Sequence, residues 1–491
     1  MATVSFSGPA AASIVSPAYQ KMTLATNYLD FTSSDVFGDG TNVAGWAQQY
    51  LPDLYEQEVD RYGNRTISGF LSMLSAEMPL QSDQVIWSEQ GRLHLAYNGT
   101  VDTTNGQVTS ITDIDGGSSN KHAVRKGATV VAVVENVVFK GYVSVGVENS
   151  ETALTILPYG AQDIEDLAGI STGSQSIKFF VYGSEFAKGS DTMANSVEPN
   201  FLTFNNRPMI IKDHFEINGS DTAQIGWIEV TGESGQGGYL WYLKSSGDTR
   251  VRFNDYMEMT MVEAEKVVTG AGVADSQLHD LGSGGVDGFN GSEGLFSAME
   301  NRGIVATNLV DNATDALADF DLLLAELDKQ GAIEENMLYL NRTSNLIFDD
   351  MLGQINANYD GGTSFGVFEN SSDMALNLGF SGFRRGSYDF YKTDWKYLND
   401  ASTRGLVGGV KGVLIPAGTS SVYDQQVGSN VRRPFLHVRY RAGQADDRKL
   451  KSWVTGSVGG PTSSSIDKME IHYLSERCLV VQAANNFVLL K

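Results

Sequence analysis

Cysteine is almost absent from this sequence of 491 residues. With Cys478 alone, no disulfide can form within one chain, which is typical of a protein that assembles in a reducing cytoplasm. We expect this thiol, which lies among apolar residues, to be an inert part of the core. Long apolar runs are also missing: none approaches the ~20 residues that a membrane helix needs. No basic segment precedes an apolar one at the N-terminus, so we expect no signal peptide.

Positive charge is scarce as well. The 35 lysines and arginines face 59 acidic residues, a formal net charge of −24. A surface this acidic repels nucleic acid, which disfavours a dedicated DNA- or RNA-binding function. An acidic surface is still compatible with a container whose wall faces nucleic acid without binding it. With 41% hydrophobic and 19% charged residues, the chain can bury substantial cores, and its length predicts about three domains of ~150 residues.

Catalytic motifs are missing too. The sequence has no Gly-Lys dipeptide and hence no Walker A loop, and it has no His-Glu-x-x-His motif. The six histidines are scattered without the spacing of metal ligands. The segment 113–116 lacks the later ligands of a calcium loop and predicts a turn, and the glycine-rich 232–238 predicts a hairpin loop rather than a phosphate cradle. We therefore predict a protein that is not an enzyme and has no catalytic, cofactor-binding or metal site.

The segment 250–270 predicts the amphipathic helix around which the fold is organised. Its apolar stripe consists of residues four apart, whereas Glu258 falls outside the stripe. The stripe residues are Phe253, Met257 and Met261. An ordinary buried helix without any chemistry explains this pattern, and its position between a β-rich half and a mixed half predicts an α+β body.

Other periodic segments predict further helices. The apolar spacing favours helices over 311–331 and 344–356, and two shorter ones within 46–77. Residues 272–300 are rich in glycine and serine and predict a long loop.

Strand patterns fill much of the remaining sequence. Residues 80–190 are rich in β-branched residues and turns, and they predict a small four-stranded unit at about 128–160. Two outer strands, near 84–95 and 176–182, would flank that unit as a long hairpin; an independent β domain is the alternative. Further predicted strands lie at 209–217, 336–340, 405–416, 433–441, 471–473, 478–482 and 486–490.

Two groups of residues are candidates for contacts between copies of the chain. The first 45 residues predict an extended arm whose apolar side chains need a surface to lie on, either its own body or a neighbour. Those that we single out are Tyr19, Tyr28 and Phe31. The second group is a late basic cluster, which either forms a solvated face or meets an acidic patch on an identical neighbour. It comprises Arg432, Arg433, Arg439, Arg441 and Arg448, with Lys449 and Lys451.

The order of these elements resembles the major capsid proteins of tailed bacteriophages, which have the HK97-like fold. Four segments carry the likeness: FFVYGSEFAKGSD…NNRPMIIKDHFEINGS at 179–220, the helix of 250–270, DFYKTDWKYLNDASTRGLVGGVKGVLIPAG at 389–418, and RRPFLHVRYRAG at 432–443. They are whole-segment patterns rather than a short signature. They resemble the larger capsid proteins, such as the crAss-like or T4-like groups.

The resemblance implies an HK97-like division of an α+β chain. The implied parts are an N-terminal arm with helices (1–75), an extended loop with a β insertion (76–190), a peripheral domain with the spine helix (191–330), an axial domain (331–470) and C-terminal strands that return to the body (471–491).

The resemblance also implies a function. The chain would be a virion protein, assembled in the host cytoplasm into hexamers and pentamers of an icosahedral shell around double-stranded DNA, with portal and decoration proteins as further partners and with no cofactor and no membrane. Two rivals remain. A tail or fibre protein usually shows repeats or heptads, and none is visible here. A β-rich polysaccharide hydrolase needs a carboxylate pair ~5–9.5 Å apart, a distance that sequence does not test.

Overall fold

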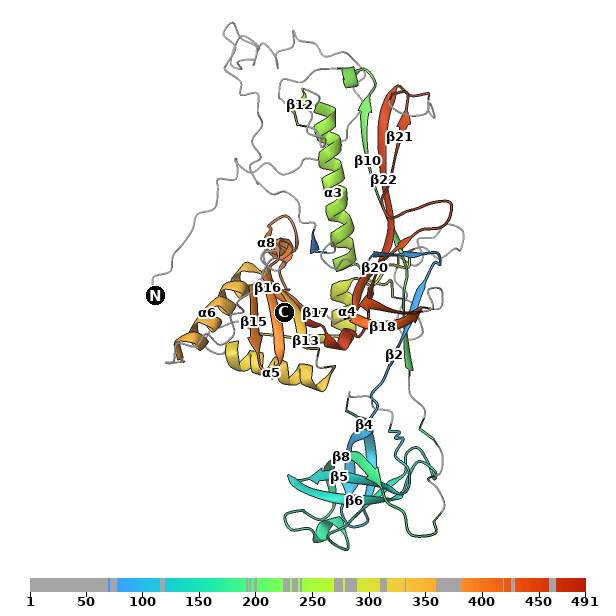
Figure 1. The fold of residues 1–491 in the computed structure, drawn as a ribbon, viewed down its shortest axis with the longest axis vertical. Coiled ribbons are helices and arrows are strands. Elements are labelled where there is room, and N and C mark those ends of the chain that lie inside the picture. Colours follow the sequence, from blue (N-terminus) through green and yellow to red (C-terminus); the bar gives the residue numbers. More distant parts are fainter. Residues whose placement is uncertain are drawn as a thin grey trace. The chain divides into compact units, whose positions relative to one another are not determined.

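The computed structural model is a mixed α and β fold with more strand than helix, in agreement with the α+β expectation. Figure 1 shows the course of the chain, and the chain divides into two compact units, residues 86–204 and the remainder. The residues that the structure describes are 69–70, 77–114, 120–190, 193, 196–197, 201–223, 230–231, 237–238, 241–268, 277–278, 289–309, 316–331, 333–358, 381–417, 419–424, 429–458 and 465–491.

The unit 86–204 contains a closed six-stranded barrel. Around the barrel the strands follow the order β3-β4-β7-β6-β5-β8. Their bounds are β3 Ala96–Asp102, β4 Gln107–Asp113, β5 Ala128–Val134, β6 Val137–Val145, β7 Leu154–Pro158 and β8 Ser174–Ser184. The β insertion is therefore larger than the predicted four-stranded unit at 128–160. The outer strand predicted near 176–182 is β8, a wall of the barrel rather than a flanking strand.

Strand alternation explains why the barrel closes on a dry interior. Side chains of alternate residues point inward, and those of Val130, Val143, Ile156 and Ile177 are fully buried. The β5–β6 connection is a turn at Glu135–Asn136, where both residues have positive φ (45° and 69°). Two such residues match the type I′ turns that the twist of a hairpin favours.

Most of a two-stranded ribbon belongs to the same unit. It pairs β2 (Val85–Gln90) with β9 (Phe201–Asn206). The prediction of a strand within 84–95 is confirmed, but its partner is β9 and not the strand near 176–182.

The larger unit contains a long sheet that is covered by α3 (Trp241–Glu263) and is antiparallel except for β1, which pairs with β20 in parallel. Its order is β1-β20-β22-β10, with β21 also paired to β22. The bounds are β1 Glu77–Leu80, β10 Met209–Asn218, β20 Leu436–Arg441, β21 Lys451–Gly456 and β22 Lys468–Val481. The two strands predicted at 471–473 and 478–482 are one continuous strand. The second of the two short helices predicted within 46–77 is wrong at its end, because Glu77 already belongs to β1.

Helix α3 begins and ends earlier than the predicted helix of 250–270. Its stripe is confirmed: Phe253, Met257 and Met261 are at most 7% exposed. Phe253 stacks on Tyr473 of β22, with ring centroids 5.7 Å apart. Figure 1 shows α3 running beside β10 and β22 for most of its length.

A six-stranded mixed sheet forms the rest of the larger unit, in the order β13-β23-β17-β14-β16-β15. Its strands are β13 Ile304–Ala306, β14 Glu335–Leu340, β15 Ser381–Arg385, β16 Tyr388–Asp394, β17 Gly412–Pro416 and β23 Val488–Leu490. Both faces of this sheet are buried. On one face, Leu338 and Leu414 pack in a core with α5 (Ala316–Lys329) and α6 (Arg342–Asn358). On the other face, Tyr339 packs in the core that contains α4 (Leu295–Arg302). The loop predicted at 272–300 is therefore wrong where α4 begins.

Short elements complete the described residues of this unit. Of the glycine-rich 232–238, Gly237 and Gly238 pair antiparallel with Thr231 and Val230, and the loop predicted between them lies outside the described residues. These elements are β11 Val230–Thr231 with β12 Gly237–Gly238, β18 Thr419–Asp424 with β19 Ser429–Pro434, and the one-turn helices α8 Lys396–Asn399 and α9 Arg404–Val407.

Candidate assembly surfaces

The described residues contain no group of three or more acidic, histidine or cysteine side chains that could hold a metal ion. Cys478 is fully buried, and burial raises the pKa of its thiol to about 12, so the expected inert thiol is confirmed as a core side chain. Asp349 and Asp350, an adjacent acidic pair, both lie on the exposed side of α6. No helix among these residues is long and apolar enough to span a bilayer.

The ribbon β2–β9 exposes large apolar side chains. Ile86 is 62% exposed, Phe201 54% and Leu202 59%. Only Trp87 is buried among the apolar residues of the ribbon; its indole N–H donates to Glu89 Oε1 at 2.9 Å, and its ring lies 6.2 Å from that of Phe204. A two-stranded ribbon is marginally stable in water and presents unpaired edges. This surface is therefore a candidate for contact with another molecule.

A buried carboxylate holds the chain at residue 70. Glu258 of α3 is only 8% exposed, and it accepts the Gly69 N–H at 2.8 Å and the Phe70 N–H. Phe70 is helical, and free N–H groups at a helix start favour a negative partner. The Phe70 ring is 4.6 Å from Trp395 and 4.8 Å from Tyr339. The segment that follows the predicted arm is thus fixed to the body by one carboxylate and an aromatic cluster.

Glu263 at the end of α3 orients a second apolar surface. Its carboxylate accepts the Tyr397 hydroxyl at 2.6 Å and pairs with Arg404 at 3.1 Å. Burial and the hydrogen bond to Glu263 raise the pKa of Tyr397 well above its usual range. Arg404 begins α9, whose Leu406 and Val407 are 76% and 75% exposed. The contacts of Glu263 therefore hold α9 and its two solvent-exposed apolar side chains in a fixed position.

The basic cluster finds counter-charges within its own chain. Arg441 pairs with Asp83 and Arg448 with Glu476, both at 2.6 Å. Lys449 pairs with Glu77, and Lys451 pairs with Asp446 at 2.7 Å. Arg439 reaches the Pro79 carbonyl at 3.4 Å. These contacts attach β1 and its neighbours to the sheet, and contact with an identical neighbour stays a prediction for this cluster.

Several predicted contact residues lie outside the part of the chain that the structure describes. Tyr19, Tyr28 and Phe31 fall within residues 1–68. Arg432 and Arg433 lie on β19, where only the backbone is described; they pair with Ser421 and Ser420 of β18.

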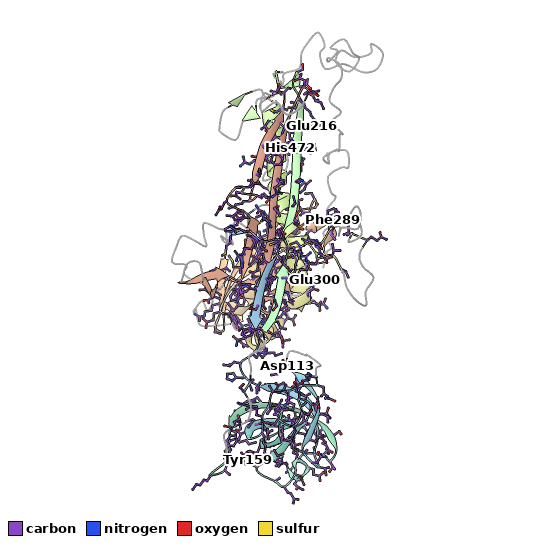
Figure 2. All side chains as sticks on the ribbon, turned by 90° about the vertical axis from the view of Figure 1, so that its right-hand side faces the viewer. Asp113, Tyr159, Glu216, Phe289, Glu300 and His472 are labelled. Carbon is purple, nitrogen blue, oxygen red and sulfur yellow. The ribbon has the colours of Figure 1, made fainter. Side chains whose placement is uncertain are left out.

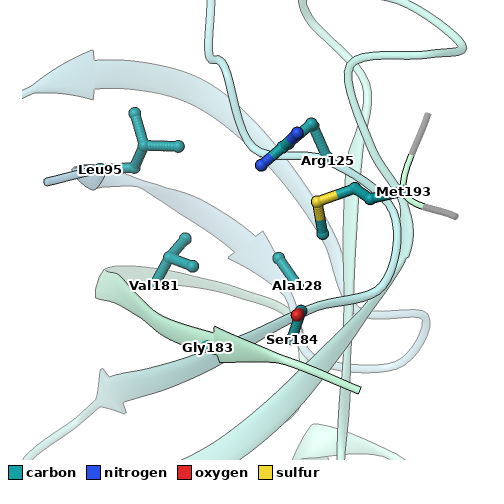
Figure 3. Close-up of a pocket in the computed structure, with 7 residues that line it drawn as sticks. All are labelled: Leu95, Arg125, Ala128, Val181, Gly183, Ser184 and Met193. Atoms are coloured by element: carbon teal, nitrogen blue, oxygen red, sulfur yellow. The ribbon is translucent and has the colours of Figure 1, made fainter. Parts of the chain in front are cut away.

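A small pocket of about 190 Å³ lies at one end of the barrel. Figure 3 shows that its lining combines Arg125 with apolar side chains such as Leu95, Val181 and Met193. No nucleophile and base lie together in this lining.

Sequence reasoning missed Glu258. The helical pattern placed it outside the apolar stripe, as is normal for a glutamate on a solvated face. Its partners, two backbone amides, lie 188 and 189 residues away in the chain. No local signal reveals such a contact.

No family model matches the sequence, and no curated protein matches it. Solved structures do show similarity. An asymmetric unit of the bacteriophage PhiM1 mature capsid matches 91% of this chain and 94% of its own, with a TM-score of 0.38 and 10% identity. A chain from Microbacterium phage Oxtober96 matches 91% and 95%, with a TM-score of 0.35 and 10% identity. The capsid structure of the cyanophage P-SCSP1u matches 75% and 84%, with a TM-score of 0.32 and 8% identity. The solved structures to which this chain is similar thus include capsids of bacteriophages.

Proposed function

We propose that this chain is the major capsid protein of a tailed double-stranded DNA bacteriophage, with an HK97-like fold and no enzymatic activity. The observation that carries the proposal is the apolar surface of the ribbon β2–β9, where Ile86, Phe201 and Leu202 are more than half exposed. Because four sequence segments resemble such capsid proteins, we expect further copies of the same chain to cover this apolar surface.

The mechanism is geometric. Burying a large apolar side chain contributes about 1.5–3 kcal/mol, so three half-exposed side chains supply about 3 kcal/mol per ribbon when a neighbour covers them. One such contact is weak, but identical interfaces related by symmetry close into a container in which every copy is held several times. In this proposal the ribbon and the arm lie across adjacent copies in hexamers and pentamers.

The proposed division follows the resemblance: residues 1–75 form the arm, 76–190 the extended loop, 191–330 the peripheral domain, 331–470 the axial domain and 471–491 the returning strands. Helix α3 would be the spine of the peripheral domain, and the six-stranded sheet would be the centre of the axial domain. The barrel would be the insertion in the extended loop.

The charge of the chain fits a wall that encloses DNA without binding it. A net charge of −24 disfavours adhesion of packaged DNA to the shell. The chain would be a virion component, assembled in the host cytoplasm, with portal and decoration proteins as its other partners. A strongly basic inner surface of the assembled shell would contradict this part of the proposal.

The test is the size of the expressed full chain, measured by size-exclusion chromatography with light scattering and by negative-stain microscopy. We expect capsomers or closed shells of several megadaltons. A monodisperse 53.1 kDa monomer at all protein concentrations and salt conditions would contradict the proposal.

A further inference from the structure

The outer wall of the barrel carries a group of aromatic side chains that its own core does not use. We call it the barrel aromatic face and define it by Tyr142, Tyr159, Phe180 and Tyr182, with Lys140 and Lys178 beside them. The strand register places them together: on β5, Val131 pairs with both Phe180 of β8 and Lys140 of β6, and Thr129 pairs with Tyr142. Tyr159 follows β7, and its N–H donates to the Lys140 carbonyl at 3.1 Å.

Three of the four rings are about half exposed to solvent, and Tyr142 is less exposed. Tyr159 is 51% exposed, Phe180 48% and Tyr182 50%. Tyr159 is labelled on the barrel in Figure 2. The barrel interior is already filled by fully buried side chains such as Val130 and Ile156. Folding of the barrel therefore does not explain why aromatic residues occupy its outer wall.

The hydroxyl of Tyr159 is held by a neighbouring carboxylate. Tyr159 donates a hydrogen bond to Glu185, and this bond raises the pKa of Tyr159 to about 12, with smaller contributions from burial and from Glu185, Tyr182 and Tyr142. The rings thus form one group, with amphipathic side chains of the kind that interfaces favour.

The face carries Lys140 and Lys178 against the single carboxylate of Glu185, so its net charge is positive, opposite to that of the chain. Lys140 and Lys178 are exposed, and neither forms an ion pair within the part of the chain that the structure describes. Elsewhere on the barrel a lysine does have a partner, since Lys121 pairs with Glu151 at 2.6 Å. Two unpaired lysines beside aromatic rings suit an acidic partner surface, and the chain itself carries an excess of 24 acidic residues.

The size of the face indicates the kind of partner. An aromatic side chain buries ~150–250 Å², so three that are about half exposed, together with the less exposed Tyr142, offer on the order of 300 Å². A stable pair of proteins needs ~800 Å² per partner. The face is thus too small to hold a separate protein by itself, but it suffices where many identical contacts act together.

We propose that the barrel aromatic face docks onto an acidic surface of a second copy of this chain in the assembled particle. The inference rests on the proposed function and adds a second contact to that of the ribbon. In it, the rings are covered by the neighbour, and the two lysines lie against its carboxylates.

The test compares full-length variants in assembly. Phe180→Ser with Tyr182→Ser removes two rings of the face. The matched control is Ile114→Ser, which is 45% exposed after β4, a strand not adjacent to β5 or β8 in the barrel. We expect the double variant to raise the protein concentration needed for assembly at least tenfold, and the control to leave it unchanged. Lys140→Glu with Lys178→Glu should raise it too, by less at high salt.

Hydroxyl-radical footprinting of the wild type keeps the test decisive if the double variant fails to fold. We expect Phe180 and Tyr182 to be oxidised several-fold less in particles than in dissociated protein, with Ile114 unchanged. Particles in which both rings stay fully reactive, or a folded double variant that assembles like the wild type, would overturn the inference and leave the proposed function standing. A wild type that never assembles would overturn both.

Discussion

The barrel and most of the ribbon are β structure in the unit 86–204, yet they differ in how they bury apolar residues. The barrel closes on itself, and Ile156 and Ile177 are completely buried. The ribbon has two strands and leaves Ile86, Phe201 and Leu202 open. Closure removes edges and encloses one face of every strand, whereas two strands can enclose nothing. We infer that the barrel is stable through its own contacts and that the ribbon needs a second molecule.

The largest expected effect on stability comes from opening the barrel core. Ile156→Ala should lower the free energy of unfolding of the barrel by about 2–5 kcal/mol, because a buried side chain is replaced by a cavity. Hydrogen exchange measured by mass spectrometry should show faster exchange in β5, β6 and β7 and unchanged exchange in α3 and β22. Leu157→Ala, the next residue on the same strand but 38% exposed, is the control. Equal loss of protection in the barrel and the larger unit would show that the barrel is not stable by itself.

An intermediate effect is expected at the contact that fixes residue 70. Glu258→Ala should destabilise that contact by about 1–3 kcal/mol, because the Gly69 and Phe70 amides lose a buried acceptor. Limited proteolysis should then cut near residue 70 sooner, while the exposed control Glu265→Ala should behave like the wild type. Unchanged proteolysis of Glu258→Ala would mean that the aromatic contacts of Phe70 suffice without the carboxylate.

A smaller, pH-dependent effect is expected in the barrel. Burial lowers the pKa of His122 below its ordinary value of 6.5, so the unfolded chain binds a proton more readily than the folded barrel. The barrel should therefore have full stability above pH 6.5 and lose part of it as the pH falls from there through the folded-state pKa. Hydrogen exchange of β5 and β6 at pH 7.5 and 5.5, corrected for intrinsic rates, measures this loss. His122→Gln should reduce it, and an equal loss in that variant would contradict the assignment.

The smallest effect on stability, and the largest on assembly, is expected in the ribbon. Phe201→Ser with Leu202→Ser should change the free energy of unfolding of the dissociated chain by less than ~0.5 kcal/mol, because both side chains are exposed. Light scattering should nevertheless show that particles no longer form. Leu322→Ser on α5, 70% exposed, is the matched control and should assemble normally. If the dissociated ribbon variant unfolds much more readily than the wild type, the exposed ribbon side chains stabilise the single chain, and the inferred difference between ribbon and barrel is wrong.

Sequence patterns predicted the parts of this fold that depend on local periodicity. The stripe of Phe253, Met257 and Met261 follows directly from the geometry of a helix, and the β-branched residues within 128–160 indicated strands there. The ends of α3 did not follow, because the helix continues toward Trp241 through residues without a clear stripe.

The remaining features depend on contacts between distant residues. Helix α4 escaped prediction because its first five residues, 295–299, are all buried and its remaining residues, all polar, follow one another in the last turn, so that no polar face reveals its period. Closure of the barrel requires β3 to pair with β8, a pairing that no local pattern encodes. The same holds for Glu258, whose role is defined by amides far away in the sequence.

The most direct test of this account is a cryo-electron microscopy map of the purified assembled particle. The account predicts a closed shell in which Ile86, Phe201 and Leu202 of each ribbon are covered by a neighbouring copy. A particle in which these three side chains face solvent, or a protein that remains a single copy under every condition, would contradict it.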